Sequence, residues 1–177
     1  HNFNELIDAS IAYLRDEPFV LYPDFRTGGM IDVRGYNDGA RGSKVQVRAR
    51  INQLDKKTLV ITEIPYGTTT GSLIDSITKA GEKGQIKIRR VDDNTSLNAE
   101  IVIHLANGVS PDQTIDALYA FTQCQVSLNS LSTCVIRNQH PEFTTISAIL
   151  KESTDRTLDL LSWELKIRLE EIEKDWH

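Results

Sequence analysis

The spacing of apolar residues along the chain predicts short helices, several strands and a long C-terminal helix. Residues 5–14 carry leucine and isoleucine at helical intervals, which predicts a short amphipathic helix. Residues 43–51 alternate strictly between apolar and polar side chains, which predicts a strand with one buried and one solvated face. From Phe143 onward a helix is expected, because apolar residues from Leu158 to Trp176 recur in steps of three and four and form a heptad-like seam.

Weaker patterns predict further turns, strands and helices between these elements. A turn at 55–57 joins the 43–51 strand to the next strand as a hairpin. The Asp-Asp-Asn run at 92–94 is interpreted as a turn rather than a metal site, because further oxygen ligands at fixed spacing are missing. The His-Pro pair at 140–141 is interpreted as a polar turn, and His104 is interpreted as a surface residue. We expect further strands at 30–34, 58–64, 85–91, 100–105 and 132–136, and helices around 73–81 and from Ser110. These elements predict the α+β class, with a mixed or antiparallel sheet and flanking helices that run into a long C-terminal helix.

A stretch rich in turn-forming residues, 22–31, separates the first helix from the sheet. Pro23 fixes its own φ and disfavours helix at the residue before it, while the Gly28–Gly29 pair admits backbone angles closed to other residues. The chain therefore turns here and delivers Met30 and Ile31 to the start of a strand. On this stretch alone, an ordinary loop that enters a sheet is the favoured interpretation. The other interpretation is a hinge that carries Ile31 as an exposed apolar tip.

Length and composition predict one sizeable domain, or one domain and an extension. The 177 residues carry a net charge of −5. No apolar run approaches the roughly 20 residues needed to cross a bilayer, and no signal segment opens the sequence. We therefore expect a cytoplasmic protein with no membrane partner. Because the first residue is His1 and the last helical pattern is unfinished, we expect a fragment of a longer chain.

No constellation of residues typical of a catalytic or metal site is found. Cys124 and Cys134 are ten positions apart without a nearby histidine pair, so two buried reduced thiols are expected rather than a metal site or a disulfide framework. The sequence contains no Walker A loop, nucleophile elbow, zincin motif or Rossmann fingerprint. No catalytic or metal-ligating residue is therefore assigned, and a hydrolase that uses His140 or Cys124 has no supporting pattern.

Basic residues are concentrated in one part of this acidic chain. Residues 1–25 contain five acidic side chains and one arginine, whereas residues 26–50 contain six basic side chains and two acidic ones. A cationic strand face suits phosphate groups. A solvated face of mixed charge is an equally good interpretation of the pattern alone. The residues expected to contact DNA are Arg34, Arg41, Lys44, Arg48, Arg50, Lys87 and Arg89.

Four motifs follow one another in the order found in one known family. They are Pro-Asp-Phe-x-Thr-Gly-Gly-x-Ile at 23–31, Arg-Gly-x-Lys-Val-x-Val-Arg-Ala-Arg at 41–50, Glu-Ile-Pro-Tyr at 63–66 and Leu-Tyr-x-x-Thr-Gln-x-Gln-x-Ser at 118–127. With them the chain resembles the breakage-reunion A subunits of bacterial type IIA DNA topoisomerases, the A subunits of gyrase and topoisomerase IV. The resemblance spans essentially the whole chain.

The resemblance implies a region that binds and bends the gate segment of double-stranded DNA. Residues 1–28 would end the winged-helix region, residues 29–152 would form a tower-like α+β DNA-binding domain, and residues 153–177 would begin the coiled-coil arm. Ile31 matches the isoleucine that inserts between base pairs in this family. The catalytic tyrosine would lie upstream of His1, so the fragment alone is expected to be inactive.

The resemblance also implies partners for the complete enzyme. It would be an ATP-dependent isomerase in which an A-subunit homodimer joins a B subunit, in the cytoplasm and associated with the nucleoid. Mg²⁺ and ATP would be bound by the B subunit, with no cofactor in this fragment. A lysine of the family is missing at 67–70 and arginines are missing near 154–156. These departures favour topoisomerase IV over gyrase only slightly, and the choice stays open.

A different class of function is compatible with the same pattern. The acidic net charge and the helical seam would suit a non-enzymatic dimerising interaction module whose basic sheet face meets an acidic protein. The two hypotheses differ in what the basic residues bind, because only DNA binding predicts a salt-dependent loss of affinity when they are removed. The wedge hypothesis makes a further demand: Ile31 should be substantially exposed in the DNA-free protein.

Overall fold

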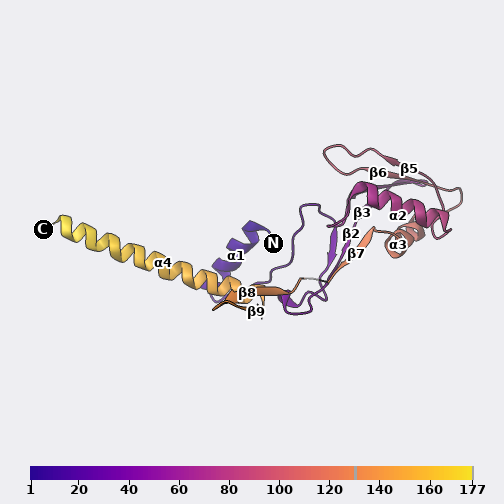
Figure 1. The fold of residues 1–177 in the computed structure, drawn as a ribbon. Coiled ribbons are helices and arrows are strands. Elements are labelled where there is room, and N and C mark those ends of the chain that lie inside the picture. Colours follow the sequence, from indigo (N-terminus) through magenta and orange to yellow (C-terminus); the bar gives the residue numbers. More distant parts are fainter. Residues whose placement is uncertain (130, 177) are drawn as a thin grey trace. The chain divides into compact units, whose positions relative to one another are not determined.

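The structure, a computed structural model, describes residues 1–129 and 131–176. The chain divides into two compact units. The first, here the helical unit, comprises His1–Pro23, Asn37–Ser43 and Ser132–His177, and the second, here the sheet unit, comprises Asp24–Tyr36 and Lys44–Leu131. The predicted α+β class, with a long C-terminal helix, is confirmed (Figure 1).

The strands of the sheet unit form two antiparallel sheets. The smaller sheet has the strand order β1-β2-β7 and the larger one the order β3-β4-β6-β5. The predicted hairpin through residues 55–57 is confirmed, because β3 pairs with β4 and Asp55 lies opposite Thr58. The strand bounds are Met30–Asp32 for β1, Val45–Arg48 for β2, Arg50–Asp55 for β3, Thr58–Glu63 for β4, Ile88–Asp93 for β5, Ile101–Leu105 for β6 and Gln125–Leu128 for β7.

Two helices, α2 (Thr70–Glu82) and α3 (Pro111–Phe121), provide side chains to the core on one face of the larger sheet. Thr69 and Ser72 form a capping box that satisfies the first free N–H groups of α2. Ser110 occupies the cap position of α3, as expected, but its side chain makes no capping hydrogen bond. The fully buried side chains of this core include Leu59, Ile61, Leu73, Ile77, Ile101, Ile103 and Leu118.

The alternating run at 43–51 is not one strand, so this prediction was wrong. It divides into β2 and β3 at Ala49, and the two strands belong to different sheets. The Ala49 N–H donates to the Cys124 carbonyl oxygen at 2.7 Å, and the Ala49 carbonyl accepts from the Tyr119 hydroxyl at 2.9 Å. Both backbone groups therefore keep partners although Ala49 is outside either strand. The predicted alternation of buried and exposed side chains is confirmed through Arg50.

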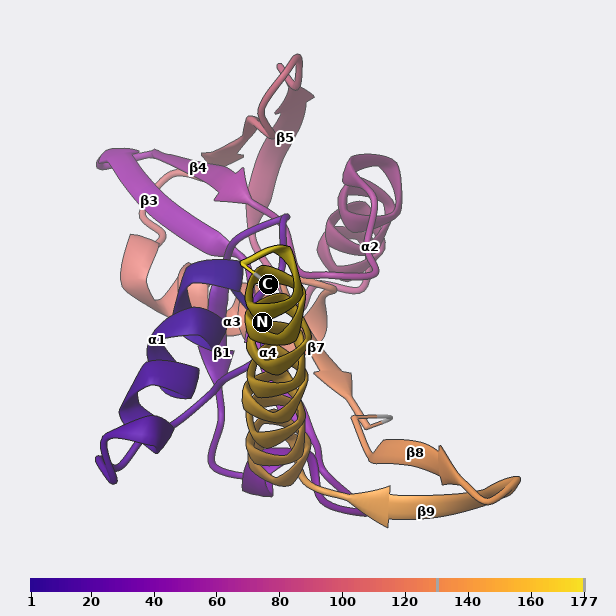
Figure 2. The same ribbon diagram turned by 90° about the vertical axis from the view of Figure 1, so that its left-hand side faces the viewer.

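The helical unit contains α1 (Phe3–Leu14), a 3-10 turn (Asn37–Gly39), a hairpin of β8 (Thr133–Arg137) and β9 (His140–Thr144), and α4 (Ile146–Asp175). Figure 2 shows the two hairpin strands side by side. Its small core consists of Ala9, Leu21 and Leu150 with their neighbours. The first helix is as predicted from the leucine and isoleucine spacing.

Two expectations for the C-terminal part were wrong. The pair at 140–141 begins strand β9, because the reversal occurs one step earlier, at Asn138 and Gln139, whose φ angles of 48° and 66° are left-handed. The last helix begins at Ile146 rather than at Phe143. Its seam residues are exposed: Leu158, Leu161, Leu165, Leu169, Ile172 and Trp176. His177, the last residue of the predicted arm, lies outside the described residues.

Three local interpretations also need correction. Asp92 and Asp93 belong to β5, where the chain was expected to turn. His104 was interpreted as a surface residue, but its side chain is half-buried and its Nε2 lies 2.8 Å from Asp92 Oδ2. Cys134 is exposed, whereas Cys124 is buried as expected, and burial raises the pKa of the Cys124 thiol to about 11.

The two compact units do not follow the predicted domains 1–28, 29–152 and 153–177, since α4 runs without a break across residues 152 and 153. Compact units and functional domains are different divisions, so the domains remain a prediction. Within residues 1–129 and 131–176, no helix combines the length and apolar character of a membrane span. In the same ranges, no group of three or more His, Cys, Asp or Glu side chains is placed to hold a metal ion.

The turn into β1 depends on close backbone approach at Gly29. Its φ is 94°, and a Cβ at this position would lie 2.5 Å from the carbonyl oxygen of Arg48. Only glycine meets both conditions, because other residues rarely adopt this φ and any side chain would collide with a backbone atom that cannot rotate away. The glycine therefore lets β1 lie against β2.

We predict that Gly29→Ala destabilises the protein by about 2 kcal/mol more than Gly67→Ala. Gly67 has a similar φ of 83°, but a Cβ there would meet nothing within 4 Å. The control thus carries the conformational strain without the clash. Chemical denaturation of both variants measures the difference, and equal losses of unfolding free energy would show that the approach to Arg48 is not limiting.

Candidate nucleic-acid interface

One face of the β1-β2-β7 sheet carries polar side chains from three strands. Residues opposite one another in antiparallel strands point to the same side, and successive residues alternate. The register places Met30, Arg48 and Gln125 in one row and Asp32, Gln46 and Ser127 in the next. We call this surface, together with Lys44 and Asn129 at its edge, the polar face.

Arg48 is held in place on the polar face by two contacts. Its Nε donates to Gln125 Oε1 at 2.6 Å, and its guanidinium carbon lies 4.8 Å from the centre of the Tyr119 ring. A guanidinium held over an aromatic ring keeps its charge and its remaining N–H donors. The structure records no ion pair between Arg48 and a carboxylate among the described residues. Arg48 is therefore a positioned cation with donors left for an anion.

Tyr119 serves two purposes at this point. Its ring supports Arg48 while its hydroxyl donates to the Ala49 carbonyl oxygen at 2.9 Å. Burial raises the pKa of Tyr119, because the ionised form is poorly solvated there. The phenol thus stays protonated at neutral pH and remains a hydrogen-bond donor.

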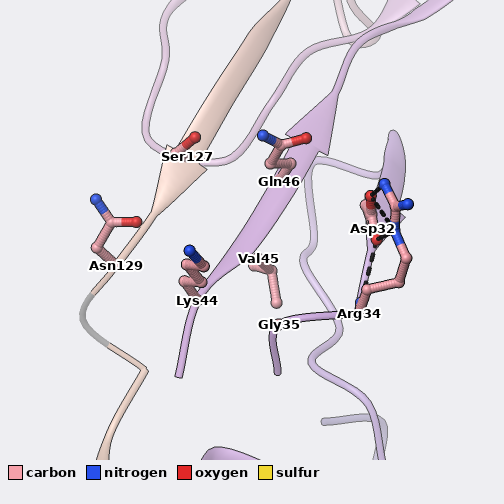
Figure 3. A pocket seen from close by; sticks show the side chains of 8 residues that line it. All are labelled: Asp32, Arg34, Gly35, Lys44, Val45, Gln46, Ser127 and Asn129. Carbon is pink, nitrogen blue, oxygen red and sulfur yellow. Dashed lines mark hydrogen bonds and ion pairs between the residues drawn. The ribbon is translucent and has the colours of Figure 1, made fainter. Parts of the chain in front are cut away.

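A shallow cavity of about 330 Å³ opens at the edge of the polar face (Figure 3). In it, Arg34 folds back onto Asp32, with Nη2 and Oδ2 2.5 Å apart. Hydrogen bonds from the Arg34 side chain and backbone lower the pKa of Asp32 to about 2, so the pair stays ionised at neutral pH. Lys44 lines the same cavity, and no ion pair is recorded for it in the described ranges. The cavity is therefore cationic through Lys44, while Arg34 is largely neutralised.

Glu63, on β4 of the larger sheet, connects this sheet to the Gly28–Gly29 turn. Its Oε2 accepts from the Gly29 N–H at 2.6 Å and from Arg50 Nε at 2.9 Å. These two bonds, the Gly29 bond first, lower the pKa of Glu63 below its ordinary value of 4.5. Arg50 is thus engaged with a carboxylate on the neighbouring strand rather than presented on the polar face.

The other predicted DNA contacts lie elsewhere. Arg41 belongs to the helical unit, where its guanidinium carbon lies 5.0 Å from the centre of the Phe143 ring. Lys87 precedes β5 and Arg89 lies within it, at the edge of the larger sheet opposite β3. Among the predicted contacts of the sheet unit, Arg34, Lys44 and Arg48 lie on or beside the polar face, whereas Arg50 follows the change of sheet at Ala49. Which of the predicted residues contact DNA remains a prediction.

Ile31 does not meet the expectation of substantial exposure. It is half-buried on the face opposite the polar one, in a row with Val47 and Val126. Its neighbour Met30 is 40% exposed and lies in the row of Arg48. The strand register explains the difference, because alternation allows only one of two neighbouring residues to reach the polar face.

Three residues that shape this interface received no role in the sequence analysis: Glu63, Tyr119 and Gln125. All three fall inside the quoted motifs, Glu63 in the one at 63–66 and the other two in the one at 118–127. These motifs were the signal in the sequence that could have pointed to the three residues. Their function becomes visible only when the fold brings them to Gly29 and Arg48.

Comparison with known proteins gives a consistent match. The family model for the A subunit of DNA gyrase/topoisomerase IV matches residues 1–177. The A subunit of DNA topoisomerase 4 from Borreliella burgdorferi is 40% identical over 172 residues, which are 97% of this chain and 27% of that protein. The A subunit of DNA gyrase from Kosmotoga olearia is 27% identical over 194 residues, covering 100% of this chain and 24% of its own length. The A subunit of DNA topoisomerase 4 from Staphylococcus epidermidis is 27% identical over 199 residues, with the same coverage. The chain spans about a quarter of the length of these curated relatives.

We predict that Glu63→Gln makes the free energy of unfolding less dependent on pH in the acidic range. A carboxyl group whose pKa is lowered by folding stabilises the fold above its unfolded pKa, and this contribution is lost as pH falls through the folded pKa. The variant should be less stable by about 1 kcal/mol at pH 7, and the difference should shrink as pH falls below 4.5.

Denaturation midpoints measured across this pH range provide the test. Glu100→Gln is the control, because the structure records no cation bound by the exposed Glu100 side chain in residues 1–129 and 131–176. Parallel pH profiles for wild type and Glu63→Gln would contradict the assignment of the lowered pKa to Gly29 and Arg50.

Proposed function

The chain belongs to the family of DNA gyrase/topoisomerase IV A subunits, and from this premise we propose that its sheet unit binds and bends the DNA segment on which a type IIA topoisomerase acts. The proposal rests above all on Arg48, which is held by Gln125 and Tyr119 and lies on a face shared with Lys44. These two cations would contact phosphate groups without reading sequence.

The neutral residues of the polar face support this assignment. Gln46, Ser127 and Asn129 lie between or beside the two cations, and their amide and hydroxyl groups donate to phosphate and sugar oxygens in protein–DNA interfaces. The Arg34–Asp32 pair lies at the rim. A face with two available cations and several neutral hydrogen-bond donors suits the sugar-phosphate backbone of DNA, which is anionic and carries its phosphates at regular intervals.

Ile31 is the proposed wedge, on the basis of the family resemblance. It packs in a row with Val47 and Val126 on a three-residue edge strand. Insertion into a base step would therefore require β1 to move away from β2. The Gly28–Gly29 turn, with left-handed φ angles of 71° and 94°, is the point at which such a movement would begin.

The activity of the whole enzyme belongs to the same proposal. We take the region to work within an A-subunit homodimer that joins an ATP- and Mg²⁺-binding B subunit in the cytoplasm, at the nucleoid. The region itself would position DNA and would not cleave it. The alternative of an interaction module for an acidic protein uses the same cations, and the first experiment below separates the two.

We predict that Lys44→Ala/Arg48→Ala weakens duplex binding equally for unrelated sequences and lowers the slope of log K against log salt by about one unit per lost contact. The control is Lys166→Ala/Arg168→Ala, which removes the same charges from exposed positions on α4. Both variants would be titrated with duplex DNA at several salt concentrations in the full-length protein. An unchanged slope for the first variant would contradict DNA binding by the polar face and favour the interaction module.

We predict that Ile31→Ala reduces DNA bending by the full-length enzyme while costing about 1–2 kcal/mol of stability, less than a fully buried isoleucine would. Met30→Ala is the matched control, because it truncates the adjacent residue on the opposite face. Bending per bound molecule and thermal unfolding would be measured for both. A large stability loss with unchanged bending would assign Ile31 to the core.

A further inference from the structure

A second group of cations gathers at the far end of the larger sheet. Lys56 and Lys57 form the turn between β3 and β4, Lys87 precedes β5, and Arg89 lies within β5. We call these four residues the hairpin cluster. All four are exposed, and the structure records no ion pair for any of them in residues 1–129 and 131–176.

Backbone hydrogen bonds bring these separate segments together. The Leu105 N–H donates to the Lys57 carbonyl oxygen at 2.8 Å, and the Ala106 N–H donates to the Lys87 carbonyl oxygen at 3.2 Å. Lys57 Nζ also donates to Asn107 Oδ1 at 3.1 Å. The end of β6 thus holds the β3–β4 turn on one side and the start of β5 on the other. The convergence of the cations follows from the fold and not from their order in the sequence.

The cluster surrounds a cavity of about 530 Å³ whose polar lining includes Lys56, Lys57, Arg89, His104 and Asn107. Asp55 is the acid of this lining, and its Oδ1 already accepts from the Lys57 N–H at 2.7 Å. That bond is the main cause of the lowered pKa of Asp55. The nearby Asp92 carboxylate is engaged with Arg90 and His104 at 2.9 Å and 2.8 Å. The cations therefore outnumber the acids at the opening.

We propose that the hairpin cluster is a second phosphate-binding surface, which takes the sugar-phosphate backbone of duplex DNA beyond the polar face. The inference rests on the proposed function of the sheet unit. An open cavity lined by exposed lysine and arginine suits a polyanion, because these cations neutralise phosphates and thereby release the counterions condensed along a continuous DNA backbone. A dedicated site for a small anion would instead bury it among fixed donors.

The spacing of the two surfaces fits one duplex. β3 extends from Arg50, next to the polar face, to Asp55 at the turn. At about 3.3 Å per residue, this separates the surfaces by roughly 17 Å. Phosphates follow one another at about 3.4 Å along each strand of B-DNA, so the interval corresponds to about five base pairs. A duplex that reaches the hairpin cluster would therefore have to extend past the polar face by about half a helical turn.

The test compares three variants of the full-length protein with wild type. Lys56→Ala/Lys57→Ala/Arg89→Ala removes the hairpin cluster's lining cations, Lys166→Ala/Arg168→Ala/Lys174→Ala removes equal charge from α4, and Lys44→Ala/Arg48→Ala removes the polar-face cations. Binding to a long duplex is measured against salt, and the long duplex is compared with one too short to pass the polar face. For the hairpin variant we expect at least a tenfold loss on the long duplex, a slope lower by two to three units, and no loss on the short one.

The possible outcomes separate this inference from the proposed function. If the polar-face variant binds DNA as wild type does, the proposed function is overturned. If the polar-face variant binds DNA more weakly but the hairpin variant binds like the α4 control, only the role of the hairpin cluster is overturned. Titration with inorganic phosphate alone tests whether the cavity binds a free phosphate ion instead of the DNA backbone. Saturable phosphate binding that the hairpin variant abolishes would assign the cavity to a small anion. If the triple variant does not fold, Lys56→Gln/Lys57→Gln replaces it, with an expected slope change of about two units.

Discussion

The architecture of the sheet unit depends on the two hydrogen bonds that the backbone of Ala49 makes where the chain passes from one sheet to the other. Its N–H and carbonyl leave both strand ladders, yet each keeps a partner, the Cys124 carbonyl and the Tyr119 hydroxyl. A buried backbone group without a partner would cost about 1–3 kcal/mol, so this pair of bonds makes the change of sheet possible. Because of it, one alternating run contributes strands to two different sheets. Arg48 lies on the polar face, and Arg50 reaches Glu63 instead.

The net charge of −5 conceals a division of the cations into two classes. Arg34, Arg50 and Arg90 are paired with carboxylates on neighbouring positions. Such exposed pairs contribute little to stability, about 0–1 kcal/mol each, but they withdraw charge from potential ligands. Among the described residues, the cations without a carboxylate partner include Lys44 and Arg48 of the polar face and those of the hairpin cluster. The distribution of paired carboxylates, rather than the number of basic residues, thus determines where the surface is cationic.

Local patterns predicted the elements and their faces well. The alternation from Val45 to Arg50 gave the correct buried and exposed sides, and the spacing of leucine and isoleucine predicted α1 and the seam of α4. The break at Ala49 could not be predicted, because the alternation continues through it and Tyr119, its partner, is 70 residues away. For the same reason, the placement of Arg48 and Arg50 in different sheets could not be predicted. Strand β9 was missed because the His-Pro pair was interpreted as a polar turn, although a two-stranded hairpin leaves one edge where proline is tolerated.

The position of Ile31 links the proposed wedge to the phosphate contacts. Arg48 and Ile31 lie on opposite faces of the same small sheet, so a duplex on the polar face does not meet the isoleucine while β1 remains paired with β2. Releasing β1 exposes a half-buried side chain, at about 1–2 kcal/mol, and unstacking a base step costs a few kcal/mol more. In the proposed function, the two cations of the polar face would offset part of this cost, and their contribution would fall as ionic strength rises. In the proposed function, further contacts along the same duplex would therefore have to form together with the bend. Ile31, half-buried on β1, would then be released only on DNA long enough to provide these contacts.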